Sequence, residues 1–210
     1  MPCVAASAPP IATDMPPLPP VTKAFILACT VVFCAQLLLG SWFEDLFALW
    51  PLASGHFMPW QVLSYAFLHG DIAHLFFNML GLWMFGSELE RLWGQKRFIH
   101  FLIAGALAAA LVQIGWTMMI GSNVPTVGAS GALFALLLAF GMLFPNRIIM
   151  PLFPPIPMKA KIFVAVFGAF ELVLGFMGAG GVAHFAHLGG MLGGFLMIRY
   201  WRGRSPFGRR

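Results

Sequence analysis

The sequence predicts an all-α membrane protein, a bundle of six transmembrane helices, and three observations support this fold class. Of the 210 residues, 60% are hydrophobic and only 9% are charged, whereas a soluble domain carries roughly a quarter charged residues. The apolar runs are long and do not alternate with polar residues, which favours helices over a β-barrel, the other structure that satisfies its backbone in lipid. Lysine and arginine occur only in every second connection between the runs, as expected for spans that cross and return.

The chain begins with a segment that does not resemble a membrane span. Residues 1–22 are predicted to form a flexible cytoplasmic tail, because the proline-rich run at 16–20 favours extended backbone. No basic stretch precedes an apolar core here, which argues against a cleaved signal peptide. The first span follows at 24–40. The next connection, 41–72, is long and rich in aromatic residues, so we expect it to lie partly in the outer leaflet.

Five further apolar segments of helical length complete the bundle. The fourth and sixth spans are short, which fits helices that begin below the membrane surface inside a protein-lined cavity. All six spans belong to one predicted domain at 23–203, and residues 204–210 form a basic cytoplasmic tail. The second to sixth spans are predicted at 73–92, 97–119, 130–146, 160–177 and 185–201.

The placement of charge predicts the orientation in the membrane. All 12 Lys and Arg residues lie on one side of the six-span topology, and the opposite side carries Glu44, Asp45 and Asp71. The positive-inside rule therefore makes both termini cytoplasmic, and we expect a multi-pass protein of the plasma (inner) membrane. A net charge of +5 also suggests nucleic-acid binding, but a nucleic-acid patch does not need this strict alternation. The expected partner is the lipid bilayer, and no nucleic acid.

Polar residues gather near the external ends of spans two, four and six. Ser130 opens the fourth span and His187 lies near the start of the sixth. Polar groups are costly at membrane depth and usually mark function there. A serine nucleophile needs a base within hydrogen-bond reach, and His187 is the candidate. Spans four and six contain no Asp or Glu, so the expected unit is a serine–histidine dyad opening to the external side.

Span two offers candidates for oxyanion stabilisation. His74 and Asn78 are four residues apart and share one helix face. The Asn78 amide can donate to an oxyanion, and the Ser130 N–H is free at a helix start. An interhelical polar clamp explains His74 and Asn78 equally well. Close approach of spans four and six is expected at the glycines Gly128, Gly131, Gly190 and Gly194.

Other titratable residues leave alternatives open. His69, His74, His184 and His187 offer a set of metal ligands, but no acidic or cysteine ligand accompanies them and the HExxH motif is absent, so we expect no metal and no cofactor. His184 precedes His187 by three residues and is an alternative base. Glu171, inside the fifth span, stays unassigned between a proton relay, a helix contact and a cavity residue.

Four motifs in order along the chain resemble one family. They are Gly128-Ala129-Ser130-Gly131 (GxSG), His187 with Gly190 and Gly194 (AHxxGxxxG), His69, His74 and Asn78 (HxxxxHxxxN), and Gly86, Glu90 and Gly94 at the end of span two. Each motif is weak alone, but together they resemble the rhomboid intramembrane serine proteases of the six-span prokaryotic type. The resemblance covers about residues 22–203.

The resemblance implies an intramembrane serine endopeptidase that cleaves transmembrane segments of membrane proteins. It implies a Ser130–His187 dyad, an oxyanion hole built from the side chains of His74 and Asn78 with the Ser130 N–H, and a supporting role for His69. It also implies a first loop embedded in the outer leaflet and lateral substrate entry near the fifth span. Oligomeric state and substrate identity do not follow from it.

Two positions depart from the family pattern. Gln61 follows Trp60 where the family often has Trp-Arg, which removes a charge and predicts weaker anchoring of the first loop. Phe134 stands where well-known members place a tyrosine that stacks on the catalytic histidine, so it keeps the ring face and lacks the hydroxyl.

Two functions are alternatives to proteolysis. One is a catalytically inactive protein that binds membrane clients, for which a degenerate dyad would be expected. The other is a transporter, for which inverted repeats would be expected.

Overall fold

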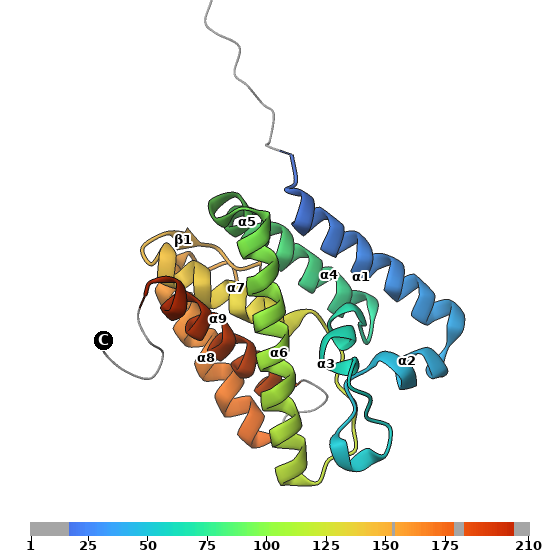
Figure 1. The fold of residues 1–210 in the computed structure, drawn as a ribbon. Coiled ribbons are helices and arrows are strands. Elements are labelled where there is room, and N and C mark those ends of the chain that lie inside the picture. The colour runs from blue at the N-terminus through green and yellow to red at the C-terminus, as the bar shows by residue number, and fades with distance from the viewer. Residues whose placement is uncertain (1–16, 153, 179–182, 204–210) are drawn as a thin grey trace, which may run out of the picture.

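The computed structural model describes residues 17–152, 154–178 and 183–203. Within these ranges the chain is a bundle of helices connected by loops, with one short β-ribbon (Figure 1). Most of the tail expected at 1–22 and all of the tail expected at 204–210 lie outside the described residues. The first helix begins at Pro20, inside the stretch predicted to be a tail, because proline is well suited to the first turn of a helix.

Long helical segments occupy the six stretches predicted as apolar spans. The second of these segments is continuous from α4 through a π-helical turn, Leu82–Gly86, into α5. Three helices, α1, α6 and α8, are long and apolar enough to cross a membrane, and α7 is a shorter apolar helix. The segments are α1 (Pro20–Leu39), α4 (Ile72–Gly81), α5 (Ser87–Trp93), α6 (Gln95–Ile120), α7 (Ser130–Leu143), α8 (Ala160–Met177) and α9 (His184–Trp201).

The connection between α1 and α4 has its own structure, organised around one buried amide. The Gln61 side chain is fully buried, and its Oε1 accepts the N–H groups of Trp50 and Met58 at 3.3 and 3.1 Å. Its Nε2 donates to the carbonyl oxygens of Asp45, Leu46 and His56. A neutral amide thus holds this loop from within. The loop contains α2 (Ser41–Phe47), α3 (Gln61–Ser64) and two 3-10 turns, Leu52–Ser54 and Tyr65–Phe67.

Two further sets of hydrogen bonds link separate segments of the chain, one at the start of α1 and one between α7 and α8. On α5, the buried carboxylate of Glu90 accepts the N–H groups of Val21 and Thr22 and the Thr22 hydroxyl, at 2.7–2.9 Å. It therefore caps the first turn of α1, where helix N–H groups lack partners. Between α7 and α8, the strands β1 (Ile148–Ile149) and β2 (Met158–Lys159) pair antiparallel.

Glycines let α9 lie against α6 on one side and α7 on the other. A Cβ placed on Gly189 or Gly193 would come within 2.8 Å of carbonyl oxygens of α6. A Cβ on Gly190 would lie 1.9 Å from the Gly131 oxygen of α7, and one on Gly194 would lie 3.0 Å from that of Ala135. Real Cβ atoms essentially never come closer than 3.0 Å to such atoms, so α9 can lie this close to α6 and α7 only with glycine at these positions. The predicted close approach of the fourth and sixth segments, α7 and α9, is therefore present.

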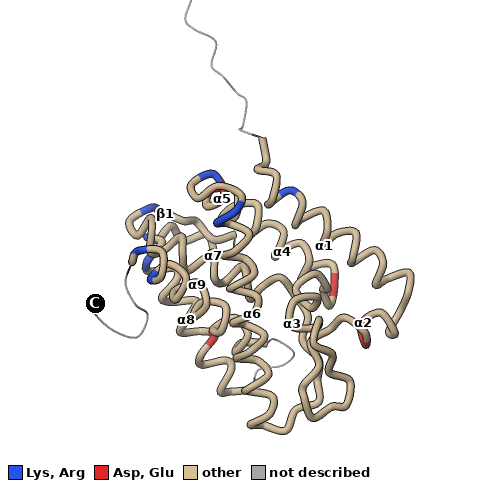
Figure 2. Tube along the Cα trace, viewed as in Figure 1, with Lys and Arg blue, Asp and Glu red and all other residues tan. Residues whose placement is uncertain are grey.

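Charge is distributed unevenly along the bundle. Figure 2 shows lysine and arginine at the end where α1 begins, where α5 lies beside the β-ribbon and where α9 ends. Acidic residues also occur away from this end, on α2 and on α8 (Figure 2). The helices α4, α7 and α9 begin away from this basic end, and residues at their starts line one common cavity.

Candidate active site

Ser130 is the first residue of α7, and the turn before it requires glycine. Gly128 has φ +128°, a conformation that side chains other than glycine rarely adopt. Its N–H donates to the Tyr65 carbonyl at 3.0 Å, and a Cβ there would lie 2.8 Å from the His74 ring and 3.5 Å from Ser130 Oγ. Gly131 is equally confined, since its Cβ would lie 2.5 Å from that of Ala109 on α6. These two glycines bring the Ser130 hydroxyl close to α4 and α9.

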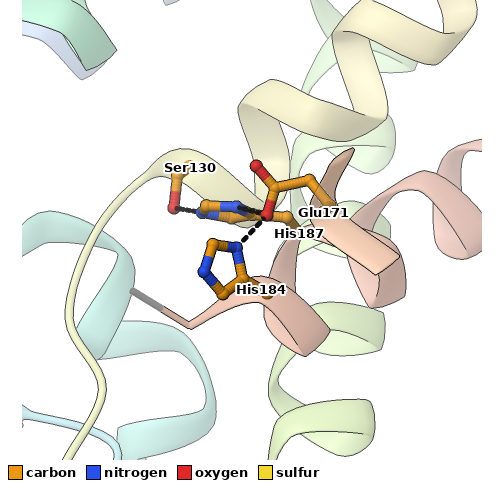
Figure 3. A network of polar contacts seen from close by, with 4 residues as sticks. All are labelled: Ser130, Glu171, His184 and His187. Atoms are coloured by element: carbon orange, nitrogen blue, oxygen red, sulfur yellow. Dashed lines mark hydrogen bonds and ion pairs between the residues drawn. The ribbon is translucent and has the colours of Figure 1, made fainter. Parts of the chain in front are cut away.

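The structure brings Ser130 and His187 together (Figure 3). Ser130 Oγ lies 2.8 Å from Nε2 of His187, which is buried in the first turn of α9. The Phe134 ring, one helical turn after Ser130, stacks on the imidazole with a centroid distance of 4.2 Å and an interplanar angle of 6°. Phenylalanine therefore supplies the ring face expected at this position, and the imidazole is held with its Nε2 edge toward the serine.

A carboxylate from α8 lies against the Ser130–His187 pair, and it belongs to Glu171, whose role the sequence left open. One oxygen of Glu171, Oε2, lies 2.8 Å from Nδ1 of His187 and 2.7 Å from Nδ1 of His184 (Figure 3). This acid comes from the fifth predicted span, whereas the fourth and sixth, which carry Ser130 and His187, contain no Asp or Glu. A signal was present, because an acid in an apolar helix needs a polar partner and His184 and His187 share a helix face.

The alternative that His184 serves as the base does not fit this arrangement. Its Nδ1 bonds to Glu171, while the nitrogen bonded to Ser130 Oγ belongs to His187. The other ring nitrogen of His184, Nε2, is buried and has no hydrogen-bond partner in the part of the chain that the structure describes. His184 is therefore a second partner of the carboxylate rather than a partner of the serine.

Glu171, His184 and His187 also form a group of possible metal ligands, whose ligating atoms lie within 4.8 Å of one another. Two ligands on one tetrahedral zinc ion, each about 2.0–2.1 Å from it, would lie roughly 3.3 Å apart. The nitrogen–oxygen distances here are 2.7 and 2.8 Å, which are hydrogen-bond lengths. The other two histidines of the metal hypothesis, His69 and His74, do not belong to this group.

The start of α4 places the His74 ring against Gly128, close to Ser130. Asp71 caps this helix through a 2.7 Å bond from the His74 N–H. The Gly70 N–H donates to His74 Nδ1 at 3.4 Å, so the ring proton belongs on Nε2. That Nε2 edge faces Gly128, next to the serine, and can donate into the space between them.

The other two expected oxyanion donors differ in how they are engaged. Asn78 is buried, and its Nδ2 donates at 2.8 Å to the His74 carbonyl of its own helix, which leaves one amide hydrogen for another acceptor. The Ser130 N–H is at the first position of α7, where no residue of the same helix can accept it. Both residues line one cavity of about 800 Å³ with His74 and His187.

His69 lies behind this site rather than in it. The residue is 1% exposed, its ring nitrogens have no hydrogen-bond partner among the described residues, and the ring contacts that of His74 edge-on at 5.1 Å. Gln36 of α1 binds its backbone on both sides, accepting the His69 N–H and donating to its carbonyl. Burial and the nearby His74 lower the pKa of His69 to about 4. It is therefore neutral at pH 7 and supports His74 by packing.

Comparison of the sequence with known proteins finds one matching family and several relatives. A sequence model of the Rhomboid domain matches residues 56–204. "Rhomboid protein 1, mitochondrial" of Saccharomyces cerevisiae is 32% identical over 138 residues, which are 65% of this chain and 40% of that protein. "Rhomboid protease GlpG" of Yersinia pestis is 26% identical over 190 residues, 89% of this chain and 64% of that protein. The chain thus spans less than two thirds of the length of these curated relatives.

Proposed function

The chain belongs to the rhomboid family, and from this premise we propose that it is an intramembrane serine endopeptidase. It cleaves transmembrane segments of membrane proteins, with Ser130 as the nucleophile and His187 as the general base. The observation that carries the proposal is the 2.8 Å separation of Ser130 Oγ and His187 Nε2. This is the distance at which a base can take the hydroxyl proton.

The reaction is acyl transfer in two stages. As Ser130 Oγ attacks the peptide carbonyl carbon, its proton passes to His187 Nε2 and the carbonyl electron pair moves onto oxygen. The protonated Nε2 then gives its proton to the leaving amine. A water molecule repeats these steps on the acyl-enzyme and releases the second product. The Phe134 ring, stacked on the imidazole, keeps Nε2 directed at the reacting atoms.

Three donors converge on the place where the oxyanion develops. These are Nε2–H of His74, the second amide hydrogen of Asn78 and the Ser130 N–H. All three residues line the cavity that contains His187. In soluble serine proteases, removing one such donor costs about 10²–10³ in kcat, and we expect the same order of loss here.

The membrane arrangement follows from the same premise. The helical segments α1, α4–α5, α6, α7, α8 and α9 are the six spans, with both termini in the cytoplasm and the cavity opening to the external side. The basic end of the bundle (Figure 2) and the positive-inside rule support this orientation. Substrate segments enter laterally near α8, whose side chains such as Phe170 and Val173 are largely exposed and apolar.

Cleavage of a membrane substrate in vesicles tests the proposal. The purified protein is reconstituted with single-span proteins that differ in the residues of the span, and products are resolved by mass. Ser130→Ala and His187→Ala should abolish cleavage, while Ser41→Ala, a serine in the exposed α2, should leave it unchanged. Cleavage that persists in Ser130→Ala would refute the mechanism. A folded wild type that binds such substrates without cleaving any of them would instead indicate a client-binding protein.

A further inference from the structure

We propose that Glu171 is a positioning residue that converts the dyad into a Ser130–His187–Glu171 triad, with His184 as the donor that fixes its carboxylate. This inference rests on the proposed function. Its basis is that Glu171 Oε2 lies 2.8 Å from His187 Nδ1 and 2.7 Å from His184 Nδ1 (Figure 3). The three side chains come from α8 and the first turn of α9.

The positions of the protons require an acceptor at His187 Nδ1. Nε2 can take the Ser130 proton only when it carries a lone pair, so the neutral ring must hold its proton on Nδ1. A buried N–H without an acceptor is unfavourable, which would favour the unreactive tautomer. The Glu171 carboxylate accepts this N–H and thereby selects the tautomer in which His187 is a base.

The same carboxylate acts again when charge develops. Proton transfer from Ser130 turns His187 into an imidazolium, and an unpaired cation at a site of low dielectric is costly. Glu171 supplies the opposite charge at hydrogen-bond distance and stays ionised throughout, as the acid does in soluble triads. The proton that leaves Ser130 stays on Nε2 until the leaving amine takes it, so no proton passes to Glu171.

His184 explains how the carboxylate is held. Two N–H donors on successive turns of one helix face share a single oxygen, which fixes the rotamer of Glu171 and compensates its partial burial. The ring contacts the carboxylate through Nδ1, and its Nε2 is buried with no partner among the described residues. His184 thus acts on the reaction only through Glu171.

The packing of α8 makes this contact a built feature. Glycines three residues before and four residues after Glu171 lie on the same side of α8, and both face α9. A Cβ on Gly168 would lie 3.2 Å from Met191, and one on Gly175 would lie 2.9 Å from the Phe185 ring. Glu171 therefore projects from the face that packs against α9, while Phe170 and Leu172 beside it are exposed.

Steady-state kinetics test the role. Glu171→Gln keeps the shape and loses the charge, and we expect kcat to fall by roughly 10²–10⁴ with little change in KM, given the loss of about 10⁴ for the equivalent change in soluble triads. Glu171→Asp should retain more activity than Glu171→Gln. Glu88→Gln, an acid on α5 that pairs with Arg147, is the matched control and should retain full activity.

A double-variant cycle and a spectroscopic signature separate positioning from folding. His184→Leu should lower kcat in the wild type and have no further effect in Glu171→Gln, because its influence passes through the carboxylate. In 15N-histidine-labelled protein, which has only six histidines, the His187 Nδ1–H proton should be shifted downfield. That signal should be lost in Glu171→Gln and in His187→Ala.

The outcomes distinguish a failure of the triad from a failure of the proposed function. If the wild type cleaves, yet Glu171→Gln has the same kcat and the same His187 spectrum, the triad is refuted and the dyad stands. If the folded wild type cleaves no substrate, the proposed function fails and the positioning role fails with it. A His187 ring protonated on Nε2 in the active wild type would also refute the triad.

Discussion

Gly190→Ala is the sharpest test of how packing holds the site. The added Cβ would lie 1.9 Å from the Gly131 oxygen and 2.7 Å from its carbonyl carbon. These are backbone atoms, so no side chain can rotate away. Real Cβ contacts begin near 3.0 Å and are ordinary above 3.4 Å, and α9 must therefore move from α7 by about 1.1–1.5 Å, since overpacked cores relax by backbone shifts.

This movement acts directly on the reacting atoms. Gly131 follows Ser130, and Gly190 lies one helical turn after His187, so the shift separates Oγ from Nε2. Their distance would grow from 2.8 Å to about 4 Å, beyond hydrogen-bond reach. A misplacement of 1 Å can cost about 10²-fold in rate, and overpacking costs about 1–3 kcal/mol of stability.

A graded series of glycine variants makes the assay specific. The rate of fluorophosphonate labelling and the melting temperature in detergent are measured for each. Gly115→Ala, with no atom within 4 Å of the new Cβ, should match the wild type, and Gly194→Ala, at 3.0 Å from backbone, should lie between. Equal rates for Gly190→Ala and Gly115→Ala would refute the reasoning.

Three further predictions concern Phe134, Gln61 and His69. Replacing Phe134 by leucine removes the ring stacked on His187, a contact worth about 0.5–1.5 kcal/mol. The labelling rate should therefore fall about 2- to 10-fold at unchanged melting temperature, while Phe134→Tyr should match the wild type. A full rate in the leucine variant would contradict the role of the ring. Gln61→Leu removes five hydrogen bonds and leaves the backbone groups of the loop that made them without this partner. It should lower the free energy of unfolding by about 2–4 kcal/mol, and its melting temperature should fall below that of the exposed control Gln95→Leu. Equal melting temperatures would count against the amide as the loop's anchor. Burial lowers the pKa of His69 from 6.5 to about 4, so as the pH falls His69 is protonated in the unfolded chain before it is protonated in the folded one. Its contribution to the free energy of unfolding is therefore present above pH 6.5 and falls by about 2 kcal/mol by pH 5. His69→Phe should remove this part of the pH dependence of the melting temperature, and an unchanged slope would show that other groups cause it.

The sequence was most informative where length and polarity decide the structure. Apolar runs of helical length predicted the long segments to within a few residues, for example 130–146 against Ser130–Leu143. Small residues at a spacing of four also predicted the contact of α7 with α9, because only glycine at Gly190 and Gly194 allows the observed approach. Ser130 and His187 meet because that contact fixes both helix starts at one depth.

The features that escaped prediction depend on tertiary detail. Which face of α8 points toward α9 is set by how Gly168 and Gly175 pack against α9. Because α8 is apolar around most of its circumference, its sequence has no polar–apolar periodicity that would indicate this face. Glu171 therefore remained unassigned. Gln61 was expected to weaken the anchoring of the first loop by removing a charge, but its buried amide bonds to Trp50, Met58 and three carbonyls of that loop. These bonds arise from the folded path of the loop.

The most direct test of the central claim is to map where a fluorophosphonate reacts. Detergent-solubilised wild type, Ser130→Ala and His187→Ala are treated in parallel, and the adduct is located by peptide mass spectrometry. We predict one phosphonylated residue, Ser130, in the wild type and no adduct in either variant, because the serine reacts only with His187 as its base. An adduct on another serine, or equal labelling of His187→Ala, would contradict the account.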